Sequence, residues 1–233
     1  MKGSAQMFNQ HPWRQAQPVW GSVLRNDQHI LELTGEGSVS TSPDMSIITM
    51  GVNSEDPNLT NAQQENNEKT TKVIQSLISL GISKENIKTA DYRIEMVYDY
   101  ENGKQTLRGY RVVHLLQVQN HQIERTGFIV DTAVRNGANT ITHIEFKVKN
   151  PQIYYSQALA LALSDAQFKA AELTREMGVK LNKVPLSIQE LNQTSPIIPL
   201  QPALFAKSEA GTPIQPGKLK INASIQVKYS YIL

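Results

Sequence analysis

The chain of 233 residues contains no cysteine. Disulfides, thiolate nucleophiles and cysteine-ligated zinc or iron–sulfur centres are therefore excluded. The chain also has little excess of either charge, because 23 Lys and Arg residues face 21 Asp and Glu residues. A nearly balanced charge argues against a strong electrostatic partner such as duplex DNA, so we expect no nucleic acid partner.

Long apolar runs are also missing from the sequence. A helix needs about 20 apolar residues to span a bilayer, and no window approaches that length. The first 28 residues contain no apolar stretch of the kind that forms the centre of a signal peptide. We therefore expect no transmembrane segment and no signal peptide in this chain, which as it stands predicts a cytoplasmic location.

Groupings of residues that break or make bonds are equally scarce. No histidine pairs with a second histidine or a carboxylate at helical zinc-site spacing, and no G-x-S-x-G nucleophile motif occurs. The stretch 35–38 (GEGS) has the glycines of a phosphate loop but lacks the following lysine, so it predicts a strand-end turn or bulge. We predict no catalytic residue, no cofactor and no metal. A metal-dependent hydrolase using His114, His143 and Glu145 is the weakest alternative.

Alternating apolar and polar residues predict most of the strands. Segments 30–33 and 45–52 indicate two strands joined by a turn. Segments 87–100 and 106–119 indicate a hairpin, because the Asn102–Gly103 pair between them tolerates positive φ. Segment 217–233 alternates most regularly, which is typical of an antiparallel sheet with one wet side.

Three segments predict helices, at 56–80, 122–135 and 151–177. The first is almost wholly polar in its N-terminal half, which must therefore face solvent or a polar partner. The third repeats alanine at helical spacing, and small residues let a helix lie close to a sheet. The element order ββαββ, then αβαβ, then β, predicts an α+β fold with a largely antiparallel sheet and helices packed on one face.

Several motifs in this order resemble the SIMPL domain (DUF541) family. They include TGEGSVSTSPDMSIITMGV at 34–52, IKTADYRI at 87–94, GANTITHIEF at 137–146 and KAAELTREMGV at 169–179. The resemblance covers about 30–233. It implies a SIMPL-like α+β fold and large oligomers, with exported members and themes of stress defence or the cell envelope. It implies no agreed activity and no catalytic residues.

Two segments flank or interrupt the expected domain, which covers 29–233. Residues 1–28 form a polar tail, which is either mobile or an arm that docks Trp13 and Trp20 on a neighbouring subunit. Residues 192–216 carry five prolines and predict a long loop, in which Phe205 is the large aromatic residue.

An aromatic cluster of Tyr92, Tyr98, Tyr100 and Tyr110 flanks the expected hairpin, and Tyr98, Tyr100 and Tyr110 complete the candidate interface. Arginines 93, 108 and 111 lie nearby in the sequence. Aromatic residues with arginine can bind single-stranded nucleic acid or a protein, whereas cross-strand packing with solvated charges is the simpler interpretation. We expect the hairpin to be a subunit contact if its tip projects.

The sequence therefore predicts a non-enzymatic protein that associates with itself into a homo-oligomer. The alternative is a monomeric or small-oligomer binding module for a protein or small molecule, with the loop at 192–216 as its contact segment.

Overall fold

A computed structural model describes residues 29–191, 198–199 and 212–233. The elements are β1 (His29–Thr41), β2 (Met45–Asp56), α1 (Leu59–Ser79), β3 (Ile87–Glu101), β4 (Lys104–Asn120), α2 (Thr126–Arg135), β5 (Thr140–Lys147), α3 (Pro151–Glu176), β6 (Lys180–Leu181), β7 (Ser187–Glu190), β8 (Ile198–Pro199) and β9 (Leu219–Ile232). This composition confirms the predicted α+β class with antiparallel pairing.

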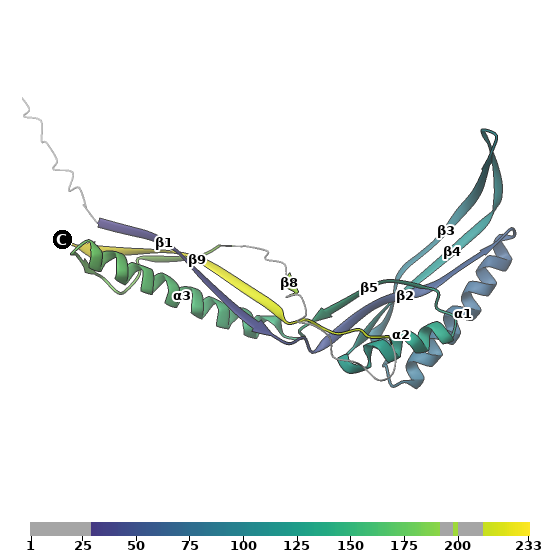
Figure 1. Cartoon of the computed structure of the whole chain (residues 1–233), viewed down its shortest axis with the longest axis horizontal. Helices are drawn as coiled ribbons and strands as arrows, with labels where there is room; N and C mark the ends of the chain where they lie inside the picture. Colours follow the sequence, from purple (N-terminus) through teal and green to yellow (C-terminus); the bar gives the residue numbers. More distant parts are fainter. Residues whose placement is uncertain (1–28, 192–197, 200–211) are drawn as a thin grey trace, which may run out of the picture.

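The strands form two sheets that lie end to end in an elongated molecule (Figure 1). In the β1–β9 sheet, β1 pairs with β9 over its whole length, and β6, β7 and β8 pair with the other side of β9. The β2–β4 sheet has the order β3-β4-β2-β5. The consecutive strands β1 and β2 thus belong to different sheets, and the turn between them leads from one sheet to the other.

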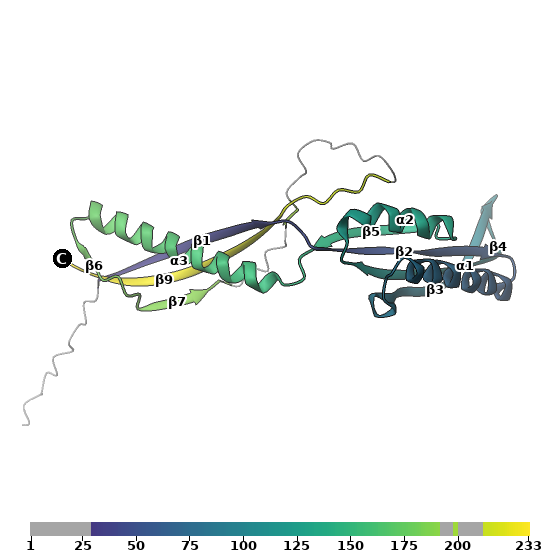
Figure 2. The same ribbon diagram turned by 90° about the horizontal axis from the view of Figure 1, so that it is seen from below.

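Each sheet has its own helical cover, as Figure 2 shows. Helix α3 runs along the β1–β9 sheet, where a stripe of buried alanines faces it: Ala158, Ala162, Ala166 and Ala170. Helices α1 and α2 pack on the β2–β4 sheet over a core that includes Ile48, Met50, Leu77, Leu116 and Ile129. The regular alternation of β9 is confirmed, because its odd-numbered positions from Leu219 to Tyr229 are all buried.

The glycines of the GEGS stretch lie inside β1, so the predicted strand-end turn is wrong. A Cβ atom at Gly35 would lie 2.1 Å from the carbonyl oxygen of Ala162, and one at Gly37 would lie 2.1 Å from that of Ala158. The backbones of β1 and α3 therefore touch at these positions. Glycine on the strand and alanine on the helix are required by this close approach rather than by a turn.

The polar half of α1 contributes two buried residues to the other core. Asn66 and Thr70 both face the β2–β4 sheet. The Asn66 Nδ2 group donates to the backbone carbonyl oxygens of Val52 and Val112 at 3.0 and 2.9 Å, and Thr70 Oγ1 donates to Asn66 Oδ1. The polar partner that the sequence required is thus the backbone of the sheet beneath the helix.

The chain segment that precedes β9 joins the two sheets a second time. Thr212 is held on α2, because its backbone N–H and its hydroxyl both donate to the Asp131 carboxylate. These bonds hold the pKa of Asp131 below its usual value. Ile214 packs against the core of the β2–β4 sheet before the chain enters β9. This anchored end belongs to the predicted proline-rich loop, most of which lies outside the described residues.

Candidate functional site

The β3–β4 hairpin projects beyond the rest of its sheet and curves away from α1 (Figure 1). Its tip turns at Asn102 and Gly103, whose φ angles are 52° and 78°. The predicted Asn-Gly turn is therefore confirmed, since glycine and asparagine accept this conformation most readily. Strand β3 is the edge of the sheet, so only β4 pairs with it among the described strands.

One side of this hairpin is apolar along its length. We call it the apolar hairpin face, and it consists of Tyr92, Ile94, Met96, Tyr98, Tyr100, Leu107 and Tyr110. Tyr100 is 74% exposed and Met96 is 60% exposed, while Tyr110, opposite Met96, is half-buried. Tyr98 donates its hydroxyl to the Met96 sulfur at 3.3 Å, which places both side chains on the same side. Contiguous exposed apolar side chains on a projecting element make this face a candidate interaction surface.

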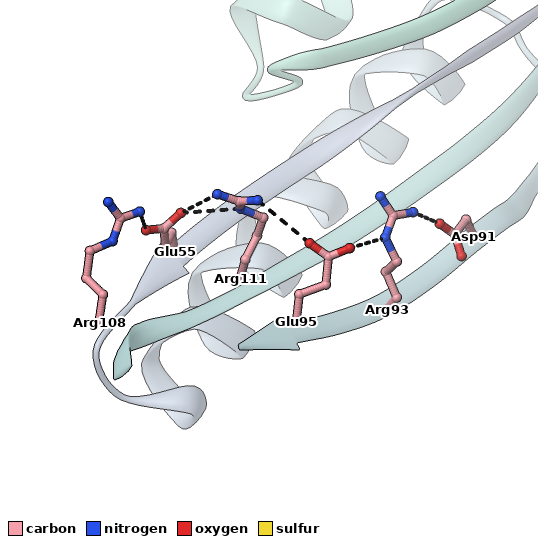
Figure 3. A network of polar contacts seen from close by, with 6 residues as sticks. All are labelled: Glu55, Asp91, Arg93, Glu95, Arg108 and Arg111. Atoms are coloured by element: carbon pink, nitrogen blue, oxygen red, sulfur yellow. Dashed lines mark hydrogen bonds and ion pairs between the residues drawn. The ribbon is translucent and has the colours of Figure 1, made fainter. Parts of the chain in front are cut away.

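The opposite side of the hairpin carries an ion-pair network (Figure 3). Glu55 of β2 binds both Arg108 and Arg111 of β4, and Arg111 also lies 3.7 Å from Glu95 of β3. Arg93 continues the row, since its guanidinium contacts both Glu95 and Asp91. Burial acts to raise the pKa of Glu55, but the hydrogen bonds and charges of Arg108 and Arg111 outweigh it and hold that pKa below its usual value.

The network ties the base of the hairpin to β2 from the side that faces away from the tyrosines. Each pair is well exposed to solvent and contributes little free energy alone. Together the pairs link three neighbouring strands, β2, β4 and β3, on this side. The arginines are thereby paired with carboxylates on the side opposite the aromatic rings, which differs from an arrangement in which arginine and aromatic side chains share one surface for stacking on bases.

The structure brings together part of the sequence-predicted interface. Tyr98, Tyr100 and Tyr110 share the apolar hairpin face, as their alternation indicated. Trp13, Trp20 and Phe205 lie outside the described residues. Ile94, Met96 and Leu107 were not predicted as interface residues, although the same alternation carried the signal for the first two.

The histidines of the weakest alternative do not come together. His114 pairs with Val52, whereas His143 pairs with Thr49 of the same strand, three residues away. Odd and even positions of a strand point to opposite faces, so the two imidazoles lie on opposite sides of the sheet. Within residues 29–191, 198–199 and 212–233, no group of three or more His, Cys, Asp or Glu side chains is placed to hold a metal.

His114 instead lies partly buried at the base of the hairpin. Its Nε2 atom lies 3.1 Å from Thr89 Oγ1, its ring meets Tyr92 edge to face, and its Nδ1 atom is buried without a partner in the described structure. Burial lowers the pKa of His114 below its usual value of 6.5. The unfolded chain therefore binds more protons than the folded chain once the pH falls below about 6.5.

We accordingly expect stability to fall as the pH drops below that value, and His114→Phe to remove part of this fall. Urea midpoints at pH 7.5 and 5.5 measure the effect, and the difference between them should be smaller in His114→Phe than in the natural protein. His143→Phe, at an exposed position, is the matched control and should keep the full difference. An unchanged difference in His114→Phe would rule out this histidine as the source.

The chain is similar to a known protein family and to several named proteins. A family model described as "SIMPL: Protein of unknown function (DUF541)" matches residues 31–229. The 26 kDa periplasmic immunogenic protein of Brucella melitensis is 29% identical over 209 residues, which cover 85% of this chain and 83% of that protein. The uncharacterized protein YggE of Escherichia coli K12 is 30% identical over 161 residues, which cover 69% of this chain and 65% of that protein. YggE of Edwardsiella ictaluri is 30% identical over 170 residues, covering 72% and 71%.

The expectation of a cytoplasmic location is contradicted by these relatives. The matched proteins of Brucella melitensis and Brucella abortus are both named periplasmic. The expectation rested on residues 1–28, which lie outside the described structure. None of the described helices combines the length and the apolar character needed to span a membrane.

Proposed function

Since the chain belongs to the SIMPL (DUF541) family, we propose that it is a non-enzymatic protein that associates with itself through the apolar hairpin face. The observation that carries this proposal is the exposure of six large residues, beside the half-buried Tyr110, on one side of a projecting hairpin. Burying such a surface against a second copy removes apolar area from water, which is the main favourable term in protein association.

The composition of the face supports a protein partner. Tyrosine and methionine are enriched in the centres of protein interfaces, where charged residues are depleted. The apolar hairpin face contains four tyrosines and one methionine, and the nearby charges lie on the opposite side in the ion-pair network. A hairpin with one apolar and one charged side is thus organised to dock by one side only.

We further propose that the protein works in the periplasm, since two relatives are named for that compartment. Co-release with a periplasmic marker on osmotic shock of the native cells tests this location, and retention with a cytoplasmic marker would refute it. A part in stress defence or upkeep of the cell envelope is implied by the family resemblance and is carried by no particular residue.

Self-association predicts a mass above the 26.0 kDa of one chain when the purified protein is examined by light scattering at micromolar concentration. The double variant Met96→Ser/Tyr100→Ser removes two of the most exposed side chains of the apolar hairpin face. We expect it to weaken association by at least about tenfold, because truncating a central aromatic residue commonly costs more than 1 kcal/mol.

Val184→Ser is the matched control, because Val184 is 72% exposed and lies outside the hairpin. It should leave the mass unchanged. A mass of one chain at tens of micromolar would refute self-association. Loss of association in both variants would show that general surface hydrophobicity, rather than the hairpin, drives it.

A further inference from the structure

The two sheets differ in whether side chains from elsewhere in the chain bind the backbone of their edge strands. Strand β1 is the edge of the β1–β9 sheet, and side chains of α3 occupy backbone groups on its outer side. The Asp165 carboxylate accepts from the backbone N–H of Glu36 at 2.9 Å, and Lys169 Nζ donates to the carbonyl oxygen of Thr34 at 3.1 Å. Asp165 and Lys169 also pair with each other at 2.6 Å. These bonds occupy two backbone groups in the middle of β1 and oppose the pairing of another strand there.

Strand β3, the edge of the β2–β4 sheet, has a different arrangement. It is 15 residues long, and the side-chain bonds of its own charged residues join side chains to side chains rather than to its backbone. Helix packing also differs, since α1 packs mainly on β2 and β4, and its Gln63 Nε2 group donates to the side-chain hydroxyl of Tyr92 in β3 at 3.4 Å rather than to the β3 backbone. A long edge strand with an exposed apolar side is suited to pair with another strand.

We propose that two copies of this chain pair their β3 strands antiparallel about a two-fold axis at Ile94, joining two four-stranded sheets into one. This inference rests on the proposed self-association and adds a backbone contact to it, in which the apolar hairpin faces of the two copies lie side by side and touch through their cross-strand pairs. The partner is a second copy because an antiparallel pair of identical strands is self-complementary, which is the requirement of a two-fold interface.

The register keeps clear of the extra residue in β3. The pairing of β3 with β4 shifts between Thr89 and Asp91, where Ala90 is an extra residue of β3, and again between Val97 and Tyr98, where Arg108 is an extra residue of β4. Strand β3 therefore continues without an extra residue from Asp91 to its end. A two-fold axis at Ile94 sets residues 91–97 of the two copies against each other and leaves Ala90 outside this segment, and the charges of the segment distinguish this axis from one a single residue away.

Charge and packing agree with this register. It sets Arg93 of each copy opposite Glu95 of the other, which is an opposite-charge pair made twice. On the apolar hairpin face it sets Tyr92 opposite Met96, also twice, with Ile94 opposite its own copy. Moving the axis to Arg93 would instead set Asp91 opposite Glu95, and like charges directly opposite are destabilising.

The absence of cysteine allows this contact to be tested with single substitutions. Paired residues of antiparallel strands have Cα atoms about 4.5–5.5 Å apart, within the range that a disulfide spans. Under mild oxidation Ile94→Cys should form a disulfide-linked dimer. The matched control is Met96→Cys on the same face, whose two copies would lie about 13 Å apart at four residues of separation. We expect at least about tenfold less dimer from the control, since this distance is too long for a disulfide.

The possible results separate the register from self-association itself. Efficient linkage of Ile94→Cys with little linkage of Met96→Cys supports the two-fold axis. Stronger linkage of Met96→Cys overturns the register. Absence of linkage in both variants, with a light-scattering mass above one chain, overturns pairing through β3 and leaves self-association standing. A mass of one chain overturns both. Circular dichroism of each variant confirms that the exposed substitution leaves the fold intact.

Discussion

Gly35→Ala is expected to lower the free energy of unfolding by about 3 kcal/mol, at the upper end of the usual cost of overpacking. The new methyl group would lie 2.1 Å from the Ala162 carbonyl oxygen and 2.8 Å from the Ala166 Cβ atom. Both belong to a helix whose backbone cannot move at one position alone. The strand and α3 must separate along several turns, which opens the contacts of Ile225, Val227 and Tyr229 beneath it.

Urea denaturation followed by circular dichroism at fixed protein concentration measures this loss. Gly37→Ala should have a similar effect, since its Cβ atom would meet the Ala158 carbonyl oxygen. Ser38→Ala is the matched control, because Ser38 lies next along β1 on the exposed side. A loss below about 0.5 kcal/mol in both glycine variants, the range of ordinary surface substitutions, would mean that α3 does not lie as close to β1 as described.

The glycines also show which part of the fold the sequence could predict. The periodicity of a strand or helix can be recognised within its own short segment of sequence. The helix predicted at 151–177 therefore agrees with the bounds of α3 to within one residue. The role of Gly35 and Gly37 depends on a helix more than 120 residues later. The local sequence alone predicts a turn at these glycines, because turns are where glycine is most common.

The division into two sheets could not be predicted from the sequence either, because it also depends on contacts between distant segments. Alternation indicates which residues of a strand are buried, but it does not indicate which strand lies beside it. The pairing of β1 with β9 joins the first and last described strands, and nothing within either segment identifies the other. The link between β1 and β2 therefore resembled an ordinary turn, although it connects two separate cores.

The candidate site was predictable where its signal was local. The Asn102–Gly103 turn and the alternating tyrosines lie within one short stretch of sequence, and together they indicate the apolar hairpin face. The ion-pair network was not predictable, because Glu55 meets Arg108 and Arg111 only once β2 and β4 lie side by side. The arginines were grouped with the tyrosines because they lie beside them in the sequence, although alternation along each strand already sets Arg93 and Arg111 on the side opposite to Tyr92 and Tyr110.

Helices α1 and α3 each bury small or polar side chains against a sheet. Both helices thereby contact the backbone of the sheet closely. In α3 this contact is steric, and alanine and glycine permit it. In α1 it is a set of hydrogen bonds, in which Asn66 binds carbonyl oxygens of two adjacent strands. One of these strands, β4, belongs to the hairpin, so Asn66 also helps to hold the base of the candidate site.

Asn66→Ala is therefore expected to lower the free energy of unfolding by about 2 kcal/mol, because it removes the two bonds that the amide donates to buried carbonyl oxygens and the one that it accepts from Thr70. Asn66→Asp should cost more at pH 7, since a carboxylate would place negative charge against the carbonyl oxygens of Val52 and Val112 in a buried position. Asn67→Ala is the matched control, being the exposed neighbour in the same helix, and should be neutral within about 0.5 kcal/mol. Urea midpoints of the three variants measure these differences. Equal stability of Asn66→Asp and the natural protein would show that this side chain does not bind the sheet, and α1 would then need another reason to bury its polar half.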